Sequence, residues 1–298
     1  MQPTILYILS TNYAGSHFLS LLVGSHSRAV HLGEVNHLRK PVDRGTCHTC
    51  GSLEQCRLLG GIPPEQVDQI YDIVYSRVGL GVSLLVDNSK RLPWAERFAD
   101  DRRYAIKYLH LIRDPRALLR RWALYYPAWP GQLKQRWQAL RAFPRRAFPL
   151  TTMPQTLVYT YRWLAENQRI TEFLMHRQPD ALLCTYEELA RGQETQVRRI
   201  MEWLGLPYEP AQLEYWHRDH HGTQKQDYEW IKQKRVHYFD QRWKSFLTPE
   251  EALAVEQNED VQAYLRTIGL SITGEGLVQS GPQIQAAAAH QGPGCPAG

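Results

Sequence analysis

Residues 5–23 read ILYILSTNYAGSHFLSLLV, and this stretch decides the fold. Its first part, residues 5–9, is short, apolar and rich in β-forming side chains, which is typical of a buried parallel strand. Residues 10–17 are mostly small or polar and predict a loop. The remaining apolar side chains share one helical face, and Gly24 stands where that helix would stop. The stretch therefore predicts a strand, a small-residue loop and a helix in direct succession.

Further apolar runs along the chain have the length and composition of buried strands. They lie at residues 84–86, 106–112 and 181–184. The second run leads to Asp114 and Pro115, which suit the N-cap and the first position of a helix. Another helix is predicted over residues 197–204, where apolar side chains recur at helical spacing before Gly205.

This alternation of strands and helices predicts an α/β protein in which helices cover both faces of a central parallel sheet. The arrangement corresponds to a three-layer, P-loop-like fold. In such sheets ligands bind at the carboxyl ends of the strands. Because the polar motifs of this chain follow predicted strands, we expect them to gather at one edge of the sheet.

The size and composition of the chain indicate one folded unit. It has 298 residues, 43% of them hydrophobic, which is enough to bury one substantial core. We expect a single α/β domain over residues 1–272. Residues 273–298 are rich in Gln, Ala, Gly and Pro without periodicity, which predicts a disordered tail.

Charge and hydropathy restrict the partners. The formal net charge of +5 suits an anionic ligand, although many ordinary enzymes carry such a charge. The sequence has no zinc-finger, basic-zipper or RNA-binding strand signature, so we expect no nucleic-acid partner. The apolar run at residues 5–9 is too short for a signal peptide or a membrane span. We therefore expect a cytoplasmic protein without stable membrane insertion.

The loop after the first predicted strand has the properties of an anion site. A small-residue turn that leads into a helix presents unpaired N–H groups and the positive end of the helix dipole. Gly15 would let the backbone approach a phosphate, and Ser16 and His17 can add side-chain donors. The nucleoside-triphosphate motif G-x-x-x-x-G-K-[ST] does not occur. By itself the loop fits an ordinary strand-to-helix turn equally well.

Several segments together carry a family resemblance. They are the loop at residues 13–17, LIRDPRALLRRW at 111–122, TYEEL at 185–189, WLGLP at 203–207, LGE at 32–34, DNSK at 87–90, HHG at 220–222 and FDQRW at 239–243. In order and spacing these segments resemble the sulfotransferases that use 3′-phosphoadenosine 5′-phosphosulfate (PAPS), in particular their bacterial and carbohydrate-type branch. The resemblance extends over residues 4–270.

The resemblance implies a nucleotide site. Its expected residues are Tyr13, Ala14, Gly15, Ser16, His17, Arg113, Arg121, His221 and Gly222. The loop amides would hold the 5′-phosphosulfate, and Arg113 with Arg121 would hold the 3′-phosphate. PAPS would be the co-substrate, with no metal required for the reaction.

The resemblance also implies the catalytic residues. Lys90 would stabilise the bridging oxygen as it leaves, and Glu34 would take the proton of the acceptor hydroxyl, with His17 as the rival base. Without the resemblance, Glu34 and Lys90 would be interpreted as solvated charges. Arg113 would then be an ion-pair partner of Asp114 or Glu187.

The chain departs from the family pattern at two positions. Tyr13 stands where the loop usually carries a basic residue, and Arg121 stands where the 3′-phosphate segment usually carries a serine. Arg121 can bind a phosphate, but Tyr13 cannot replace a cation. Lys90 could supply that charge, or the mechanism could be modified.

Two other functions therefore remain open. One is a phosphotransferase that uses a nucleoside triphosphate with magnesium, against which the missing loop motif argues. The other is a catalytically degenerate protein that binds 3′-phosphoadenosine 5′-phosphate (PAP) without turnover. For a sulfotransferase, the resemblance favours a carbohydrate or another small hydroxyl compound as acceptor.

Cys47, Cys50 and Cys56 form a C-x2-C-x5-C cluster, with His37 and His48 nearby in the sequence. Structural zinc sites need four ligands and usually combine two such knuckles. Because only one knuckle is present, packed or reducible thiols are the preferred interpretation, and zinc is the alternative.

Overall fold

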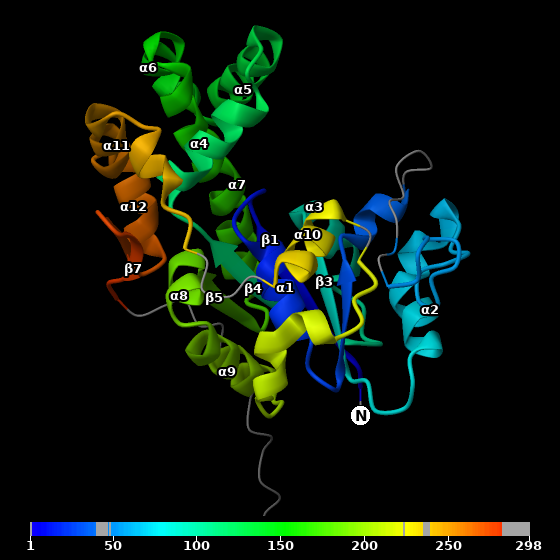
Figure 1. Ribbon diagram of the computed structural model, residues 1–298. Helices are drawn as coiled ribbons and strands as arrows, with labels where there is room; N and C mark the ends of the chain where they lie inside the picture. Colours follow the sequence, from blue (N-terminus) through cyan, green and yellow to red (C-terminus); the bar gives the residue numbers. More distant parts are fainter. Residues whose placement is uncertain (1, 40–46, 48, 223, 235–238, 282–298) are drawn as a thin grey trace, which may run out of the picture.

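The computed structural model describes residues 2–39, 47, 49–222, 224–234 and 239–281. A five-stranded parallel sheet runs through its centre in the order β2-β3-β1-β4-β5 (Figure 1). The strands are β1 (Thr4–Ser10), β2 (Ala29–Gly33), β3 (Leu84–Lys90), β4 (Ala105–Ile112) and β5 (Ala181–Thr185). The predicted α/β class and the central parallel sheet are confirmed.

The strands are buried on both faces, as the short apolar runs predicted. In β1, Leu6 and Ile8 point into a core shared with α1 (Ser16–Gly24) and α9 (Gln193–Leu204). Tyr7 points the other way, into a core that includes residues of α2 (Ile70–Arg77) and α7 (Gln155–Arg177). This alternation follows from the two-residue period of a strand and produces the three layers.

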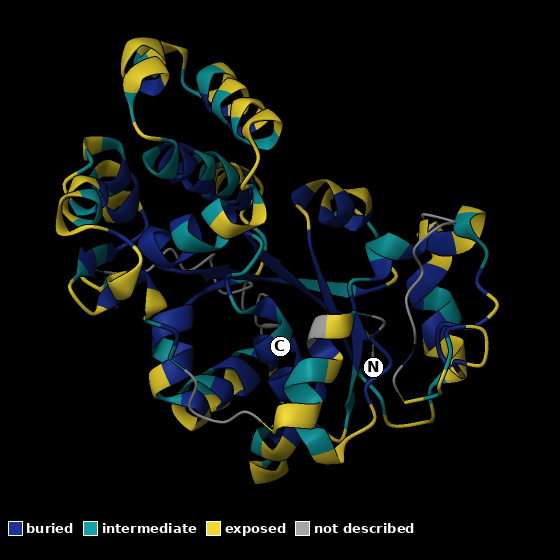
Figure 2. Cartoon of the chain, turned by 45° about the horizontal axis from the view of Figure 1, so that its top comes forward, coloured by how far each residue is buried: buried dark blue, intermediate teal, exposed yellow. Residues whose placement is uncertain are grey.

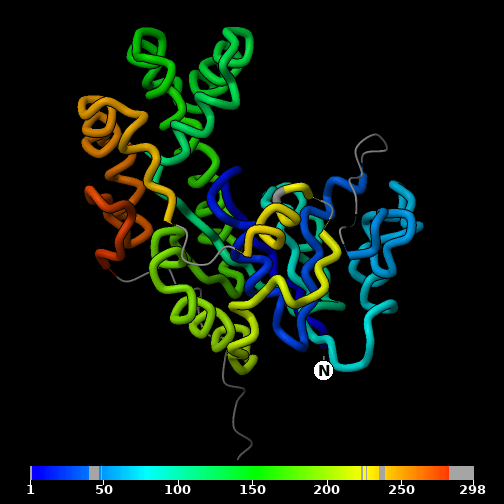
Figure 3. The backbone as a smooth tube through the Cα atoms, viewed as in Figure 1, coloured from blue at the N-terminus to red at the C-terminus, as the bar shows by residue number. Residues whose placement is uncertain are grey.

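A second group of helices lies beside the β5 edge of the sheet. It consists of α4 (Pro115–Tyr125), α5 (Trp129–Ala142), α6 (Ala147–Thr152), α11 (Pro249–Glu256) and α12 (Glu259–Thr267), packed around or next to α7. Figure 3 shows α5 and α6 extending from the body of the molecule, and Figure 2 shows that their surfaces are largely exposed. The remaining α-helices of the described chain are α3 (Leu92–Ala95), α8 (Tyr186–Arg191) and α10 (Lys225–Gln233).

Local signals predicted several element boundaries correctly. Asp114 caps α4 by accepting a hydrogen bond from the Arg116 N–H, and Pro115 is the first residue of that helix. Gly205 ends α9 with a φ of 72°, the left-handed conformation expected of a C-terminal glycine. Strand β2 was not predicted, because His31 interrupts its apolar pattern. Inside the protein the His31 ring is buried and pairs with the Ser20 hydroxyl at 3.1 Å.

The folded part continues beyond the expected boundary at residue 272. Strands β6 (Leu270–Thr273) and β7 (Gly276–Gln279) form an antiparallel hairpin, and Leu277 in β7 is fully buried in the core beside α12. The predicted end of the domain therefore divides this hairpin. The rest of the predicted tail, residues 282–298, lies outside the described residues.

Among the described residues, no helix combines the length and the apolar character that crossing a membrane requires.

Candidate active site

The carboxyl edge of the sheet carries the residues that the sequence motifs selected. Glu34 follows β2, Lys90 ends β3, Arg113 follows β4 and the loop at residues 11–15 follows β1. Strand order brings these ends together, because β1 lies between β3 and β4. The chain leaves β1 toward β2 and leaves β4 toward β5, so this edge contains the topological switch point at which such sheets bind ligands.

The loop after β1 leads into the N-terminus of α1, and its conformation depends on a glycine. Gly15 has a φ of 101°, and a Cβ atom at this position would lie 2.6 Å from Cδ2 of Tyr186. Only glycine therefore fits between the loop and this ring. As the N-cap residue it offers no side chain to the first turn of α1, whose N–H groups can serve a ligand.

Three predicted catalytic side chains are in contact. His17 Nε2 lies 2.9 Å from Glu34 Oε1 and 3.0 Å from Lys90 Nζ, and Lys90 also forms an ion pair with Glu34. On its other side His17 Nδ1 lies 2.6 Å from Oδ1 of Asp227 in α10. We call these four residues the transfer cluster. The sequence analysis did not select Asp227, which belongs to none of the recognised motifs.

The transfer cluster is largely buried, so its charges act strongly on one another. Lys90 is 7% exposed and Asp227 is 1% exposed, which excludes the interpretation of Lys90 as a solvated surface charge. Burial and Lys90 lower the pKa of His17, but Asp227 and Glu34 outweigh them and raise it. Burial raises the pKa of Glu34, but Lys90 and His17 prevail and hold it well below its usual range. Two carboxylates thus face two cations.

Arg113 lies on the other side of the loop and ties it to the C-terminal part of the chain. Its Nη1 donates to the Tyr13 carbonyl at 2.9 Å, and its Nη2 lies 3.3 Å from a carboxylate oxygen of Asp240. The guanidinium group stacks over the Tyr186 ring, with 4.0 Å between its central carbon and the ring centre. Asp240, rather than Asp114, is the ion-pair partner of Arg113; Asp114 pairs with Arg116.

More positive than negative charge gathers around Asp240. Arg242 also pairs with this carboxylate, at 2.7 Å, and the Asp240 charge acts on Arg121. Burial alone would raise the pKa of Asp240. Arg242 and Arg113 have the larger effect and hold the pKa below its usual range, so the carboxylate is ionised. We call Arg113, Arg121, Arg242 and Asp240 the arginine cluster: two guanidinium groups pair with one carboxylate, and a third lies within reach of its charge.

Two observations indicate that the positive charge of the arginine cluster is not fully compensated. Nε of Arg113 and Nε of Arg121 are buried without a hydrogen-bond partner among the described residues. The nearby Glu187 offers little compensating charge, because burial and Asp114 raise its pKa to about 8. A buried donor without a partner destabilises the protein unless a ligand or water satisfies it, so these groups favour a bound anion.

The two departures from the family pattern lie next to each other. The guanidinium carbon of Arg121 is 5.4 Å from the centre of the Tyr13 ring, within the range of a cation–π contact. Burial, followed by the charge of Arg242, lowers the pKa of Arg121, as expected for a cation among cations. Arg121 therefore places a positive charge beside Tyr13, which stands where the family pattern has a basic side chain.

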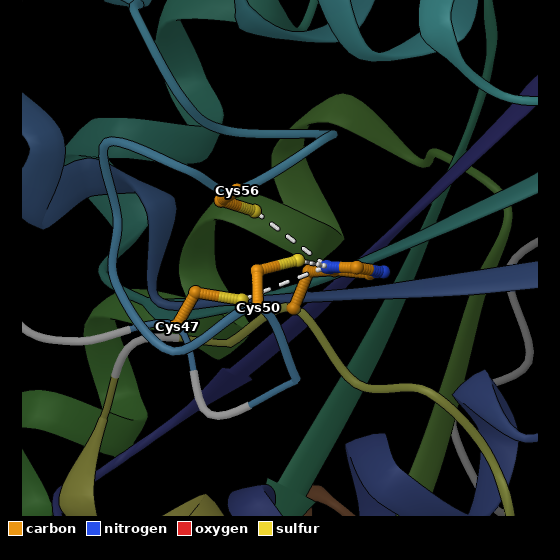
Figure 4. A group of neighbouring side chains, drawn as sticks. Cys47, Cys50 and Cys56 are labelled. Atoms are coloured by element: carbon orange, nitrogen blue, oxygen red, sulfur yellow. Dashed lines mark hydrogen bonds between the residues drawn. The ribbon is translucent and has the colours of Figure 1, made fainter.

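Gly222 packs against Asp227 of the transfer cluster, and His221 precedes it in the chain. A Cβ atom on Gly222 would come within 2.5 Å of Oδ2 of Asp227, and a Cβ atom on Gly33 within 2.9 Å of the Gly222 Cα. The His221 ring instead faces the sulfur atoms of three cysteines (Figure 4). The expected nucleotide contacts of His221 and Gly222 remain predictions.

Known structures share this fold. The sulfotransferase domain from the curacin biosynthetic pathway superposes with a TM-score of 0.50 and 18% identity, covering 85% of this chain and 96% of that domain. The sulfotransferase domain from the Synechococcus PCC 7002 olefin synthase gives a TM-score of 0.50 and 16% identity, covering 85% and 94%. Mouse sulfotransferase SULT7A1, solved with PAP, gives 0.43 and 12%, covering 90% and 89%.

No protein-family model and no curated protein matches the sequence. The likeness to the curacin and olefin synthase domains, at these identities, is one of architecture. The class of protein that the fold defines is therefore an α/β protein with a sulfotransferase fold.

Proposed function

We propose that this protein transfers a sulfuryl group from PAPS to the hydroxyl group of a carbohydrate or another small compound. The observation that carries the proposal is the contact between Lys90, Glu34 and His17 beside the glycine-capped N-terminus of α1. It combines a cation, a carboxylate and an imidazole at the strand edge where such sheets bind ligands. The sulfotransferase fold supports the same reaction class.

The donor has two anionic ends, and the site offers a positive region for each. In this proposal the Gly15, Ser16 and His17 amides hold the 5′-phosphosulfate at the start of α1. Arg113 and Arg121 hold the 3′-phosphate, since the arginine cluster contains two more cations than carboxylates and has donors that find no partner among the described residues. Tyr186 stacks on Arg113 and keeps its guanidinium group in place.

The transfer step then proceeds in line. The acceptor oxygen forms a bond to sulfur while the bond from sulfur to the bridging oxygen of the 5′-phosphate breaks, and PAP leaves with the electron pair of that bond. Lys90 stabilises the negative charge that develops on the bridging oxygen. The hydroxyl proton passes to Glu34, and the acceptor leaves as its sulfate ester.

The contacts within the transfer cluster explain how Glu34 becomes basic enough. In the free protein Lys90 and His17 keep the pKa of Glu34 low. When Lys90 turns to the donor's anionic oxygens, Glu34 shares this cation with them, and its pKa rises toward the range of a useful base. His17 is the weaker candidate, because its raised pKa favours the protonated form that cannot accept a proton.

The experiment that tests the proposal is a calorimetric titration with PAP. We expect micromolar binding, and we expect Arg113→Ala to weaken it by about 1.5–3 kcal/mol, the usual contribution of a hydrogen bond to a charged group. This corresponds to a loss of affinity of about 10- to 150-fold. Arg146→Ala is the matched control, because Arg146 is a partly exposed arginine paired with Asp260 on the distant α12.

Circular dichroism of each variant will confirm that the fold is intact before affinities are compared. No binding at millimolar PAP would overturn the proposal and direct attention to nucleoside triphosphates with magnesium. Binding of PAP without turnover of PAPS, across a panel of hydroxyl acceptors, would instead favour a catalytically inactive binding protein.

A further inference from the structure

Four potential metal ligands meet outside the transfer cluster. Cys47, Cys50 and Cys56 belong to the segment between β2 and α2, and His221 belongs to the loop before α10. The Nδ1 atom of His221 lies 3.6 Å from the sulfur of Cys47 and 3.5 Å from those of Cys50 and Cys56 (Figure 4). All four ligand atoms lie within 4.8 Å of one another.

The sulfur-to-nitrogen separations are those of a tetrahedral zinc site. With Zn–S bonds of about 2.3 Å and Zn–N bonds of about 2.0–2.1 Å, a tetrahedron places sulfur and nitrogen about 3.6 Å apart. The observed sulfur-to-nitrogen distances agree with this edge length, and all three cysteines are free thiols. Cys47, Cys56 and His221 are at least 96% buried and Cys50 is half-buried, so three of the four ligands are shielded from water.

We propose that Cys47, Cys50, Cys56 and His221 bind one Zn²⁺ ion as a structural site. Four protein ligands complete the tetrahedron and leave no open position for a substrate, which distinguishes such a site from a catalytic zinc. The chemistry also favours zinc over magnesium or calcium, because these harder ions prefer oxygen ligands. The assignment holds whether or not the protein transfers sulfuryl groups.

The surroundings of the ligands suit thiolates. The Leu59 N–H donates to the sulfur of Cys56 at 3.3 Å, and such hydrogen bonds stabilise a negatively charged sulfur. Three thiolates, a neutral imidazole and Zn²⁺ have a net charge of −1, and the Arg57 guanidinium lies beside them. When zinc binds Nδ1 of His221, the imidazole proton lies on Nε2, which can then no longer accept a hydrogen bond. The hydrogen bond from Arg57 Nε to this nitrogen must therefore break, while the ion pair between Arg57 and Asp219 can remain.

The proposed ion would join two segments that are 165 to 174 residues apart in the sequence. Beside it, Thr49 and His220 exchange hydrogen bonds: the Thr49 hydroxyl donates to the His220 carbonyl at 2.6 Å and accepts from the His220 N–H at 3.1 Å. Because ligands so far apart in the sequence meet only in the folded chain, the free energy of zinc binding would add to the stability of the fold.

The segment that follows His221 reaches the transfer cluster through Gln224 and through Asp227 in α10. The Gln224 side-chain oxygen accepts a hydrogen bond from the Glu34 N–H at 3.0 Å, and Asp227 contacts His17 at 2.6 Å. Zinc would therefore fix the position of the segment that orients Glu34 and His17 without touching either residue.

The first test is the metal content of the full chain purified without chelator. We expect about one equivalent of zinc per chain. We also expect that Co²⁺ added to the metal-depleted protein binds at one equivalent, with the intense visible absorption of a tetrahedral thiolate site. Less than about a tenth of an equivalent of zinc, together with no such cobalt spectrum, would overturn the proposal.

Ligand variants identify the residues. Cys56→Ser and His221→Asn should each lower zinc affinity at least tenfold, because each removes one of four ligands. The matched controls are Cys184→Ser, which changes a buried free thiol of β5 outside the cluster, and His217→Asn, which changes an exposed histidine. Stoichiometric zinc that survives both ligand variants would show that other residues bind it. If a ligand variant does not fold, the zinc content and cobalt spectrum of the unaltered protein decide the question.

Discussion

The transfer cluster and the arginine cluster lie on opposite sides of one loop, and they differ in charge balance. Around His17, two cations face two carboxylates in close contact. Around Asp240, Arg113 and Arg242 pair with one carboxylate and Arg121 lies within reach of its charge. Within the part of the chain that the structure describes, Arg113 and Arg121 each have a buried Nε without a hydrogen-bond partner. Lys90 and Asp227 of the first cluster and Arg113 and Asp240 of the second are buried, whereas Arg121 is partly exposed and Arg242 is exposed, so solvent screens the outer part of the arginine cluster.

This difference in charge balance indicates that the two clusters have different roles. A cluster with equal numbers of opposite charges is stable without a ligand. When a bound anion attracts one of its cations, the pKa values of the remaining groups change. An unbalanced cationic cluster is stabilised when an anion arrives. The first therefore suits chemistry, and the second suits binding. If this interpretation is correct, substitutions in the two clusters should have different kinetic consequences.

The largest expected effect comes from the transfer cluster. Lys90→Ala and Glu34→Gln should each lower the rate of PAPS turnover by about 10²–10³, because each removes a group placed at the reacting atoms. PAP affinity should change much less than in Arg113→Ala. Turnover can be followed as PAP formation from PAPS in the presence of a hydroxyl acceptor.

His17→Asn separates the two candidate bases in the same assay. If Glu34 is the base, Glu34→Gln should lose more activity than His17→Asn. Near-normal turnover in Lys90→Ala or Glu34→Gln would remove that residue from the mechanism, and a larger loss in His17→Asn would transfer the role of base to His17.

A smaller effect is expected from Arg121→Ala in the arginine cluster. Arg121 is partly exposed and close to Tyr13, so solvent screens its interaction with a phosphate more than that of Arg113. We expect a loss of PAP affinity of about 1 kcal/mol, roughly fivefold, by calorimetry. A loss as large as that of Arg113→Ala would show that the two arginines contribute equally to the phosphate site.

The smallest effect concerns the pH dependence of stability. His17 faces Asp227 from α10, Glu34 after β2 and Lys90 from β3, and the net result is a raised pKa. A raised folded-state pKa contributes stability that is complete below the ordinary value of 6.5 and is lost as the pH rises through the folded-state value. The difference in unfolding free energy between the unaltered protein and His17→Asn should therefore shrink as the pH rises above 6.5.

Denaturant unfolding at several pH values measures this difference. Because the asparagine variant has no titrating group at position 17, it serves as its own reference across the pH range. A difference that grows with rising pH would contradict the proposed balance, since it would mean that the folded protein holds His17 in its neutral form.

Much of the fold could be predicted because its signals are local. Apolar runs, small-residue loops and capping residues such as Asp114 and Gly205 act within a few residues of their own positions, and the structure places strands and helices where they indicated. The gathering of Lys90 and Arg113 at one edge also followed, because parallel strands all end on the same side of a sheet. Glu34 joins them through β2, a strand that was not predicted.

The partners of these residues could not be predicted in the same way. Asp227, Asp240 and His221 lie far along the chain from the side chains that they contact, and no local pattern links them to those side chains. In the sequence, the cysteine knuckle has too few ligands for zinc, because the remaining ligand comes from a distant loop. His48, which is close to the cysteines in the sequence, lies outside the described residues. A histidine pair before Gly222 was the available signal, but its interpretation as a nucleotide loop took precedence.

The sequence by itself determined the α/β class, the order of the elements and the strand edge at which a ligand is expected. Short-range physics accounts for this, because periodicity and capping are encoded in neighbouring residues. Only the tertiary structure decided the charge balance of the two clusters and the fourth ligand of the cysteine site. These depend on which distant side chains are buried together, and burial in a folded core is a property of the whole chain.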